Sequence, residues 1–413
     1  MIKDGVNILG FLNNQFGVAE LGRLIMRCIA SAAIPYVVNI LSTPLHHLTD
    51  EIIPNVSTTN RYKINIIVAN HNEIGWIIQQ KGSKYFTGKY NIGVWCWETE
   101  KFPNVPASQL KYFDEIWTIS EFCKQSMMKS VGIPIKVITL PIILPTNVSR
   151  YGGIDPDKFV VLFSFDFRSR PERKNPLGAI EAFKKAFGND SNVLLFIKSI
   201  NLRSNGYYDK LISNAIAGCS NIKFLDSSLS RGDTFALIRA CDVYLSLHRS
   251  EGLGLGMMEA MAMGKVVIGT GYSGNMDFMA GENSMLVKYS KIQIAAHISP
   301  YFEKGVSWAE PDISDAAEKL KIIYTDKNLR EKIGSEAKKS IEEKYNLKIC
   351  EEHFKMLLSE IKIPRIEVFD ESFYLTTHPD VAAAVKKGQL KNGLMHYNLY
   401  GKKEGRIFRL STE

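Results

Sequence analysis

Apolar and polar positions along the first 150 residues form short apolar runs separated by segments of helical spacing. The apolar runs predict buried strands at residues 6–11, 36–40, 64–69, 90–95, 115–119 and 135–138. Between the first two runs, Leu21, Leu24, Ile25 and Ile29 recur on one side, so residues 19–33 are expected to form a helix that Pro35 closes. Strands that alternate with helices indicate a parallel sheet covered on both faces.

The same pattern begins again after residues 141–156, which are rich in Pro, Gly, Asn and Ser and are typical of a linker. Strands are expected at 159–164, 193–198, 222–225, 243–247 and 266–269, with a helix at 175–187. The sequence therefore predicts an α/β protein with two doubly wound, Rossmann-like domains, residues 1–148 and 149–340, that face a ligand cleft.

The remaining chain has few Gly or Pro residues before Pro364 and is expected to be helical over 315–361. We expect 341–365 to be a helical return segment and 366–413 a small, mainly helical module. At this size the module is near the lower limit for folding alone, so we expect it to pack on the main body or on a partner.

The composition is that of a globular protein, with 413 residues, 45% hydrophobic and 23% charged. No apolar run reaches the ~18 residues that span a bilayer, and the first residues lack the pattern of a secretory signal. The net charge of +8 is spread along the chain without a dense basic stripe, which argues against a nucleic-acid partner. The six cysteines form no C-x-x-C pair, so we expect reduced thiols in a cytoplasmic protein, with peripheral contact at the inner face of the membrane left open.

The segment 248–265 carries the most chemical information. Its glycines permit a tight turn and close approach of backbone N–H groups to a ligand, and a helix is expected to begin near Gly256. The positive end of that helix suits a phosphate or diphosphate. Glu251 in the loop and Glu259 in the helix are expected to face the same cleft, where carboxylates would accept hydrogen bonds from neutral sugar hydroxyls.

The frame Ser-Glu-Gly-Leu-Gly-Leu-Gly, with Glu259 eight positions after Glu251, resembles the family-4 glycosyltransferases of GT-B fold. The similarity continues through 271–278 and includes a glycine-containing loop at 13–23. The segments 95–103, 116–122 and 165–176 resemble a bacterial surface-polysaccharide branch, and together the resemblance covers about residues 5–360.

The resemblance implies a retaining enzyme that takes a nucleotide sugar as donor and a carbohydrate or lipid-linked molecule as acceptor. It implies that Glu251 contacts the transferred sugar, that Glu259 contacts the ribose, and that Lys174 and Arg173 neutralise the leaving diphosphate. Arg168 is a second choice for the arginine. The diphosphate-binding backbone would come from the loop at Gly254, Leu255 and Gly256 and, from the other domain, Gly17.

One departure concerns the N-terminal domain, where many relatives carry a histidine after the strand that here ends in Trp95-Cys96-Trp97. Glu98 and His71 are the ionisable groups nearest to that place, and either could contact a sugar. His248 and Lys198, near strand ends, are further candidates for donor binding. Trp95 and Trp97 are expected to belong to the core rather than to a sugar platform.

No cofactor or metal is expected, because no His, Cys, Asp or Glu cluster has metal-ligand spacing. Asp155-Pro156-Asp157 has the Asp-x-Asp spacing of another glycosyltransferase fold, but a turn accounts for it better. A nucleotide-sugar epimerase of the same fold and a non-catalytic glycan- or nucleotide-binding protein remain alternatives, while the absence of G-x-G-x-x-G after the first strand disfavours a dehydrogenase. The aromatic-rich tail resembles a module appended to some bacterial surface-glycan glycosyltransferases, for which docking or tethering of the acceptor is the expected role.

Overall fold

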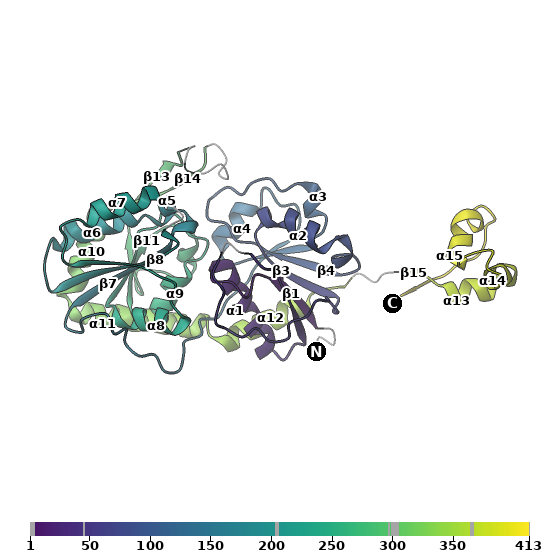
Figure 1. Cartoon of the computed structure of the whole chain (residues 1–413), viewed down its shortest axis with the longest axis horizontal. Helices are drawn as coiled ribbons and strands as arrows, with labels where there is room; N and C mark the ends of the chain where they lie inside the picture. Colours follow the sequence, from purple (N-terminus) through teal and green to yellow (C-terminus); the bar gives the residue numbers. More distant parts are fainter. Residues whose placement is uncertain are drawn as a thin grey trace. The chain divides into compact units, whose positions relative to one another are not determined.

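The computed structural model describes residues 5–43, 46–202, 206–295, 298, 305–363 and 367–412. The chain forms two compact units, one of residues 1–86 and 91–361 and one of residues 362–413 with the short segment 87–90. The larger unit holds two six-stranded sheets, each with its own helices (Figure 1). Pro364 and the boundary expected at 365–366 lie outside the described residues.

The first half of the larger unit is built on a six-stranded sheet of order β2-β1-β3-β4-β5-β6. The strands are β1 (Val6–Gly10), β2 (Tyr36–Ile40), β3 (Ile64–Val68), β4 (Tyr90–Val94), β5 (Glu115–Thr118) and β6 (Ile135–Val137). The described pairings within it are parallel. Strands β1 and β3 are buried along their whole length, which explains why their sequences are almost continuously apolar.

Helices connect these strands and bury their apolar sides against the sheet. They are α1 (Gly17–Ser31), α2 (Ile74–Lys81), α3 (Ala107–Leu110) and α4 (Glu121–Met127), with 3₁₀ turns η1 (His71–Glu73) and η2 (Ser83–Tyr85). Helix α1 begins two residues earlier than its apolar spacing predicts. Helix α4 is capped by Ser120, whose hydroxyl accepts a hydrogen bond from the Cys123 N–H. Trp95 and Trp97 belong to the apolar cluster of this half.

The second half repeats the plan with a sheet of order β12-β11-β10-β7-β8-β9, again with parallel pairings. Its strands are β7 (Phe159–Asp166), β8 (Val193–Ile200), β9 (Ile222–Asp226), β10 (Val243–Ser246), β11 (Val266–Thr270) and β12 (Met285–Val287). Residues 141–156, between the two sheets, contain no helix or strand. The two parallel doubly wound sheets expected from the sequence are therefore present.

Helices lie on both faces of the second sheet (Figure 1). They are α5 (Pro171–Lys174), α6 (Pro176–Phe187), α7 (Gly206–Ile216), α8 (Arg231–Ala240) and α9 (Leu255–Ala262), with 3₁₀ turns η3 (Phe167–Ser169) and η5 (Gly274–Asp277). Val161, Leu195 and Leu245 face the apolar cluster that contains residues of α6. The intervening position Tyr244 contacts the first turn of α9, so it faces the opposite side of the sheet.

The segment expected to be helical over 315–361 is helical, and the structure divides it into three helices. These are α10 (Ile313–Thr325), α11 (Lys327–Lys344) and α12 (Leu347–Ser359). Asp326 and Asn346 start the second and third helices, since their side chains accept hydrogen bonds from the N–H groups of Leu329 and Ile349. Helix α12 returns to the first half, where it packs against α1 and Phe354 meets Trp117.

An antiparallel ribbon of β13 (Tyr289–Gln293) and β14 (Ser307–Pro311) was not anticipated. All residues of β13 are exposed, so this strand has no apolar alternation by which the sequence could predict it.

The C-terminal unit is small and mainly helical, as expected. It consists of β15 (Glu367–Phe369), α13 (Glu371–Thr377), α14 (Pro379–Lys386), α15 (Gly393–His396), the π-helical turn η6 (Tyr397–Gly401) and β16 (Leu410–Thr412). Strands β15 and β16 pair antiparallel. Tyr374 is fully buried at its centre, and its hydroxyl and the ring of His396 lie in hydrogen-bond contact at 3.1 Å.

Candidate active site

A cavity of about 380 Å³ lies between the two halves of the larger unit. The first half contributes Gly17 at the start of α1 together with Asn70 and Glu98, which follow β3 and β4. The second half contributes residues near the carboxyl ends of β7, β8 and β10 and the loop that leads into α9. A cleft at the carboxyl ends of parallel strands is the place where doubly wound folds bind ligands.

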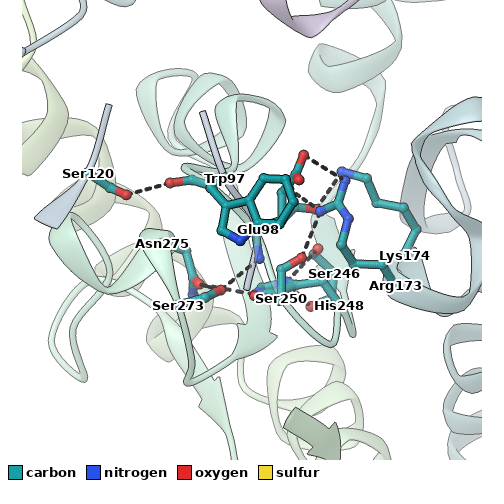
Figure 2. A network of polar contacts seen from close by, with 12 residues as sticks. Trp97, Glu98, Ser120, Arg173, Lys174, Ser246, His248, Ser250, Ser273 and Asn275 are labelled. Carbon is teal, nitrogen blue, oxygen red and sulfur yellow. Dashed lines mark hydrogen bonds and ion pairs between the residues drawn. The ribbon is translucent and has the colours of Figure 1, made fainter. Parts of the chain in front are cut away.

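Three charged side chains meet on the wall that the second half contributes (Figure 2). Lys174 Nζ donates a short hydrogen bond to Glu251 Oε1, and Arg173 Nη1 lies 3.0 Å from Glu251 Oε2. Arg173 Nη1 also donates to the Ser250 carbonyl at 2.7 Å. The backbone joins the same segments, because the Arg249 N–H donates to the Arg173 carbonyl at 2.7 Å.

The cations decide the charge state of this cluster. Burial acts to raise the pKa of Glu251, but Lys174 and Arg173 outweigh burial and hold that pKa well below its usual 4.5. Burial lowers the pKa of Lys174 against the attraction of Glu251, whereas Glu251 and Glu98 together overcome burial and raise the pKa of Arg173. The pairing keeps Glu251 ionised, and two cations share this one buried carboxylate.

The loop before α9 approaches its neighbours closely. Gly254, the N-cap of α9, has φ +96°, a conformation that a side chain would strain. A Cβ on Gly256 would come within 2.5 Å of the Tyr244 hydroxyl. Gly254, Leu255 and Gly256 all line the cavity, so the first turn of α9 presents its unpaired N–H groups there.

Glu259 lies differently from the expectation that it would share the cleft with Glu251. It is on α9 and buried, and it is absent from the residues that line the cavity. Its Oε1 lies 2.5 Å from Arg231 Nη2, which is also 3.5 Å from Glu20 Oε1 of the first half. Burial raises the pKa of Glu259, and Arg231 opposes the change.

His248 and Arg168 are not among the residues that line the cavity, and their expected part in donor binding stays a prediction. His248 is fully buried with protein partners for both ring nitrogens: Nδ1 lies 3.0 Å from Ser246 Oγ, and Nε2 lies 3.0 Å from Asn275 Oδ1. Its place is therefore to hold the strand end to the 273–275 turn (Figure 2). Arg168 is exposed in η3.

Gly17, Glu98 and Lys198 do line the cavity. A Cβ on Gly17 would meet no atom within 4 Å. Glu98 lies 3.6 Å from Arg173 and keeps 37% of its side chain exposed. Burial lowers the pKa of Lys198, while Asp166 and Asp226 act in the opposite direction.

His71 does not line the cavity. Its ring packs edge-on against Trp97 and Phe102, with centroids 5.1 and 4.6 Å away. Burial lowers its pKa to about 4. His71 is therefore a neutral member of an aromatic cluster at neutral pH, and Glu98 is the nearer of the two groups to the cavity.

The two halves are tied together beside the cavity. Ser120 Oγ donates to the Gly252 carbonyl at 2.6 Å, and the Glu121 N–H donates to Asp277 Oδ2 at 2.8 Å. Lys291 on β13 pairs with Glu100 at 2.6 Å. The first contact holds the glycine loop against the first half, and the other two join η5 and β13 to it.

Sequence reasoning missed two residues that the structure brings to this region, Tyr244 and Arg231. Tyr244 lines the cavity and stands two positions before Ser246, so strand alternation places both on one face. Arg231 reaches Glu259 from the start of α8, and no sequence spacing connects these two elements.

Across the described ranges, no group of three or more His, Cys, Asp or Glu side chains is placed to hold a metal ion. No helix in the described part of the chain is both long and apolar enough to cross a membrane. Asp155 and Asp157 lie in a turn, in which the Asp157 N–H donates to Asp155 Oδ1 at 3.0 Å.

Residues 148–340, which include the glycine loop, Lys174 and Glu251, match the family model described as Glycosyl transferases group 1. No curated protein matches the sequence significantly. The matched segment coincides with the second doubly wound half, and it therefore supplies the charged wall of the cavity.

Solved structures share the fold at low sequence identity. HepE of Anabaena, in complex with UDP and glucose, aligns with TM-score 0.63 and 14% identity over 87% of this chain and 100% of HepE. Sucrose-phosphate synthase of Thermosynechococcus elongatus aligns with TM-score 0.63 and 12% identity, over 87% of this chain and 99% of the synthase. The pneumococcal O-GlcNAc transferase GtfA aligns with TM-score 0.51 and 18% identity, over 72% of this chain and 56% of GtfA. The GT-B fold predicted from the motif frame is thus confirmed.

Proposed function

We propose that this protein is a retaining glycosyltransferase that moves a hexose from a nucleoside-diphosphate donor to a carbohydrate or lipid-linked acceptor of the bacterial surface. The observation that carries the proposal is the cluster of Lys174, Arg173 and Glu251 beside the first turn of α9 in one cavity. Two cations and free helix N–H groups suit a diphosphate, and a carboxylate held ionised suits sugar hydroxyls.

Leaving-group stabilisation follows from this placement. As the bond between the anomeric carbon and the diphosphate oxygen breaks, the electron pair goes to the diphosphate, where Lys174 and Arg173 offset the new charge. The acceptor hydroxyl forms its bond to the anomeric carbon on the same face, and its proton passes to the departing diphosphate. Configuration is retained without a covalent bond to the enzyme.

Glu251 has the properties needed to hold the sugar. Its side chain is only 10% exposed and is fixed by Lys174 and Arg173, so it stays an acceptor for hydroxyl groups at neutral pH. Asn70 and Glu98 form the facing wall, where an acceptor would enter. Glu98 takes the place in this proposal that a histidine has in many members of the resembled family.

Uracil nucleotides are the first donors to test, because HepE was crystallised with UDP-glucose and GtfA with UDP and GlcNAc. The 362–413 unit is proposed to dock or tether the acceptor, in line with the surface-glycan resemblance. Catalysis by the larger unit at the inner face of the membrane would agree with a lipid-linked acceptor.

The experiment is a panel of UDP-, GDP- and ADP-sugars incubated with the full chain, followed by product analysis. Release of the nucleoside diphosphate with a free or transferred sugar supports the proposal. Recovery of an epimerised nucleotide sugar would support the epimerase alternative instead. If no member of the panel binds in calorimetry, the proposal fails.

A further inference from the structure

Tyr244 lies on β10 beneath the first turn of α9. Its hydroxyl is so close to that turn that a Cβ on Gly256 would be 2.5 Å from it. The residue is 7% exposed and lines the cavity together with Ser246 and Gly254. The ring is thus fixed in the sheet, and the polar end of the side chain reaches the place where the helix N–H groups emerge.

The Tyr244 hydroxyl has no hydrogen-bond partner among the described residues. The hydroxyl oxygen keeps some accessible surface at the cavity, so it is free to donate a hydrogen bond there. Ser246, two positions along the same strand, is already engaged, with Oγ 3.0 Å from His248 Nδ1. The free hydroxyl therefore offers a hydrogen bond to whatever occupies the cavity.

The surroundings keep this hydroxyl protonated. Burial raises the pKa of Tyr244, and the carboxylates of Glu259 and Glu251 raise it further. A neutral donor that feels two carboxylates adds attraction for an anion without adding a third charge. It would partly offset the repulsion that those carboxylates exert on a bound diphosphate.

We infer that the Tyr244 hydroxyl donates a hydrogen bond to a diphosphate oxygen of the donor at the first turn of α9. The inference rests on the proposed function, because it assumes that a nucleoside diphosphate occupies the cavity. We expect the diphosphate, rather than the ribose or the sugar, to accept this hydrogen bond. The hydroxyl lies against Gly256, where the helix N–H groups already favour an anion. Tyr244 is thereby a binding residue for the leaving group.

The test is Tyr244→Phe in the full chain, which removes the hydroxyl and keeps the ring. We expect the affinity for UDP, measured by calorimetry, to fall roughly tenfold, as for a hydrogen bond to a charged group. Binding of uridine, followed by nuclear magnetic resonance titration, should stay within twofold of wild type. The matched control is Tyr324→Phe, which removes a hydroxyl from α10, in the same half but outside the cavity lining.

The outcomes separate the two claims. UDP affinity within twofold of wild type in a Tyr244→Phe variant of unchanged thermal stability overturns the inference, as does an equal loss for UDP and uridine. In both cases the proposed function stands if Lys174→Ala still weakens UDP binding. If wild-type protein binds none of UDP, GDP and ADP, the proposed function fails and the inference falls with it.

Discussion

Arg231 at the start of α8 lies 3.5 Å from Glu20 on α1, and this ion pair connects the two halves of the larger unit. The same guanidinium nitrogen contacts Glu259 in the second half. Glu20 in turn pairs with Arg23 at 2.7 Å, within a cluster that Arg27 and Glu51 complete. Glu259, which the resemblance predicts to contact the ribose, is therefore linked to the first half through one arginine.

Arg231→Ala is expected to destabilise the protein by about 2 kcal/mol, because Glu259 would stay buried without its cation. Chemical denaturation measures this difference. Arg239→Ala is the matched control, since Arg239 is exposed on the same helix. Equal stability of the two variants would show that the Arg231 pair contributes nothing to the fold.

The contact between Gly256 and Tyr244 predicts a coupled pair of substitutions. Gly256→Ala would force a Cβ against the Tyr244 hydroxyl and should cost about 1–2 kcal/mol of stability. In a Tyr244→Phe background the ring carbon nearest to the new Cβ would be 3.3 Å from it. The loss of stability caused by Gly256→Ala should therefore be smaller by about 1 kcal/mol. A double-mutant cycle from denaturation curves gives the coupling. Additive effects would contradict the close approach described here.

The fold was largely predictable from the sequence because both sheets are buried on two faces. Strands such as β1 and β3 are then almost continuously apolar, a pattern that an exposed strand does not have. Helix ends set by single polar caps, such as Asp326, escaped detection because the apolar spacing continues across them. The exposed ribbon of β13 and β14 has no core-facing pattern at all.

The site residues were predictable from the sequence only where they lie together in one short motif. The glycine loop and Glu251 lie within one short segment, whereas Lys174 meets Glu251 across 77 residues and was placed there by resemblance alone. The Arg231 contact with Glu259 depends on how α8 and α9 pack, which spacing does not encode. His248 shows the reverse case, in which a residue beside the motif serves to hold the loop.

Because of Glu251, the free energy of unfolding should depend on pH in the acidic range. The pKa of Glu251 is lower in the folded chain than the 4.5 of the unfolded chain, so its pairing stabilises the fold above pH 4.5. That contribution is lost as pH falls from 4.5 toward the folded pKa. In urea denaturation at descending pH, Glu251→Gln should be less stable than wild type at pH 7, and the gap should narrow below pH 4.5. A gap that is constant with pH would contradict the pairing.

The central claim is that Lys174 and Glu251 act on a nucleoside-diphosphate sugar in the cavity. The most direct measurement is the rate of UDP release from UDP-sugars by wild type, Lys174→Ala and Glu251→Ala, with Lys185→Ala as control because Lys185 lies on α6 and pairs with Ser314. The account predicts losses of at least about a hundredfold for the two cavity variants, as for removal of one charge-stabilising group, and none for the control. Wild-type rates in folded Lys174→Ala and Glu251→Ala proteins would contradict it.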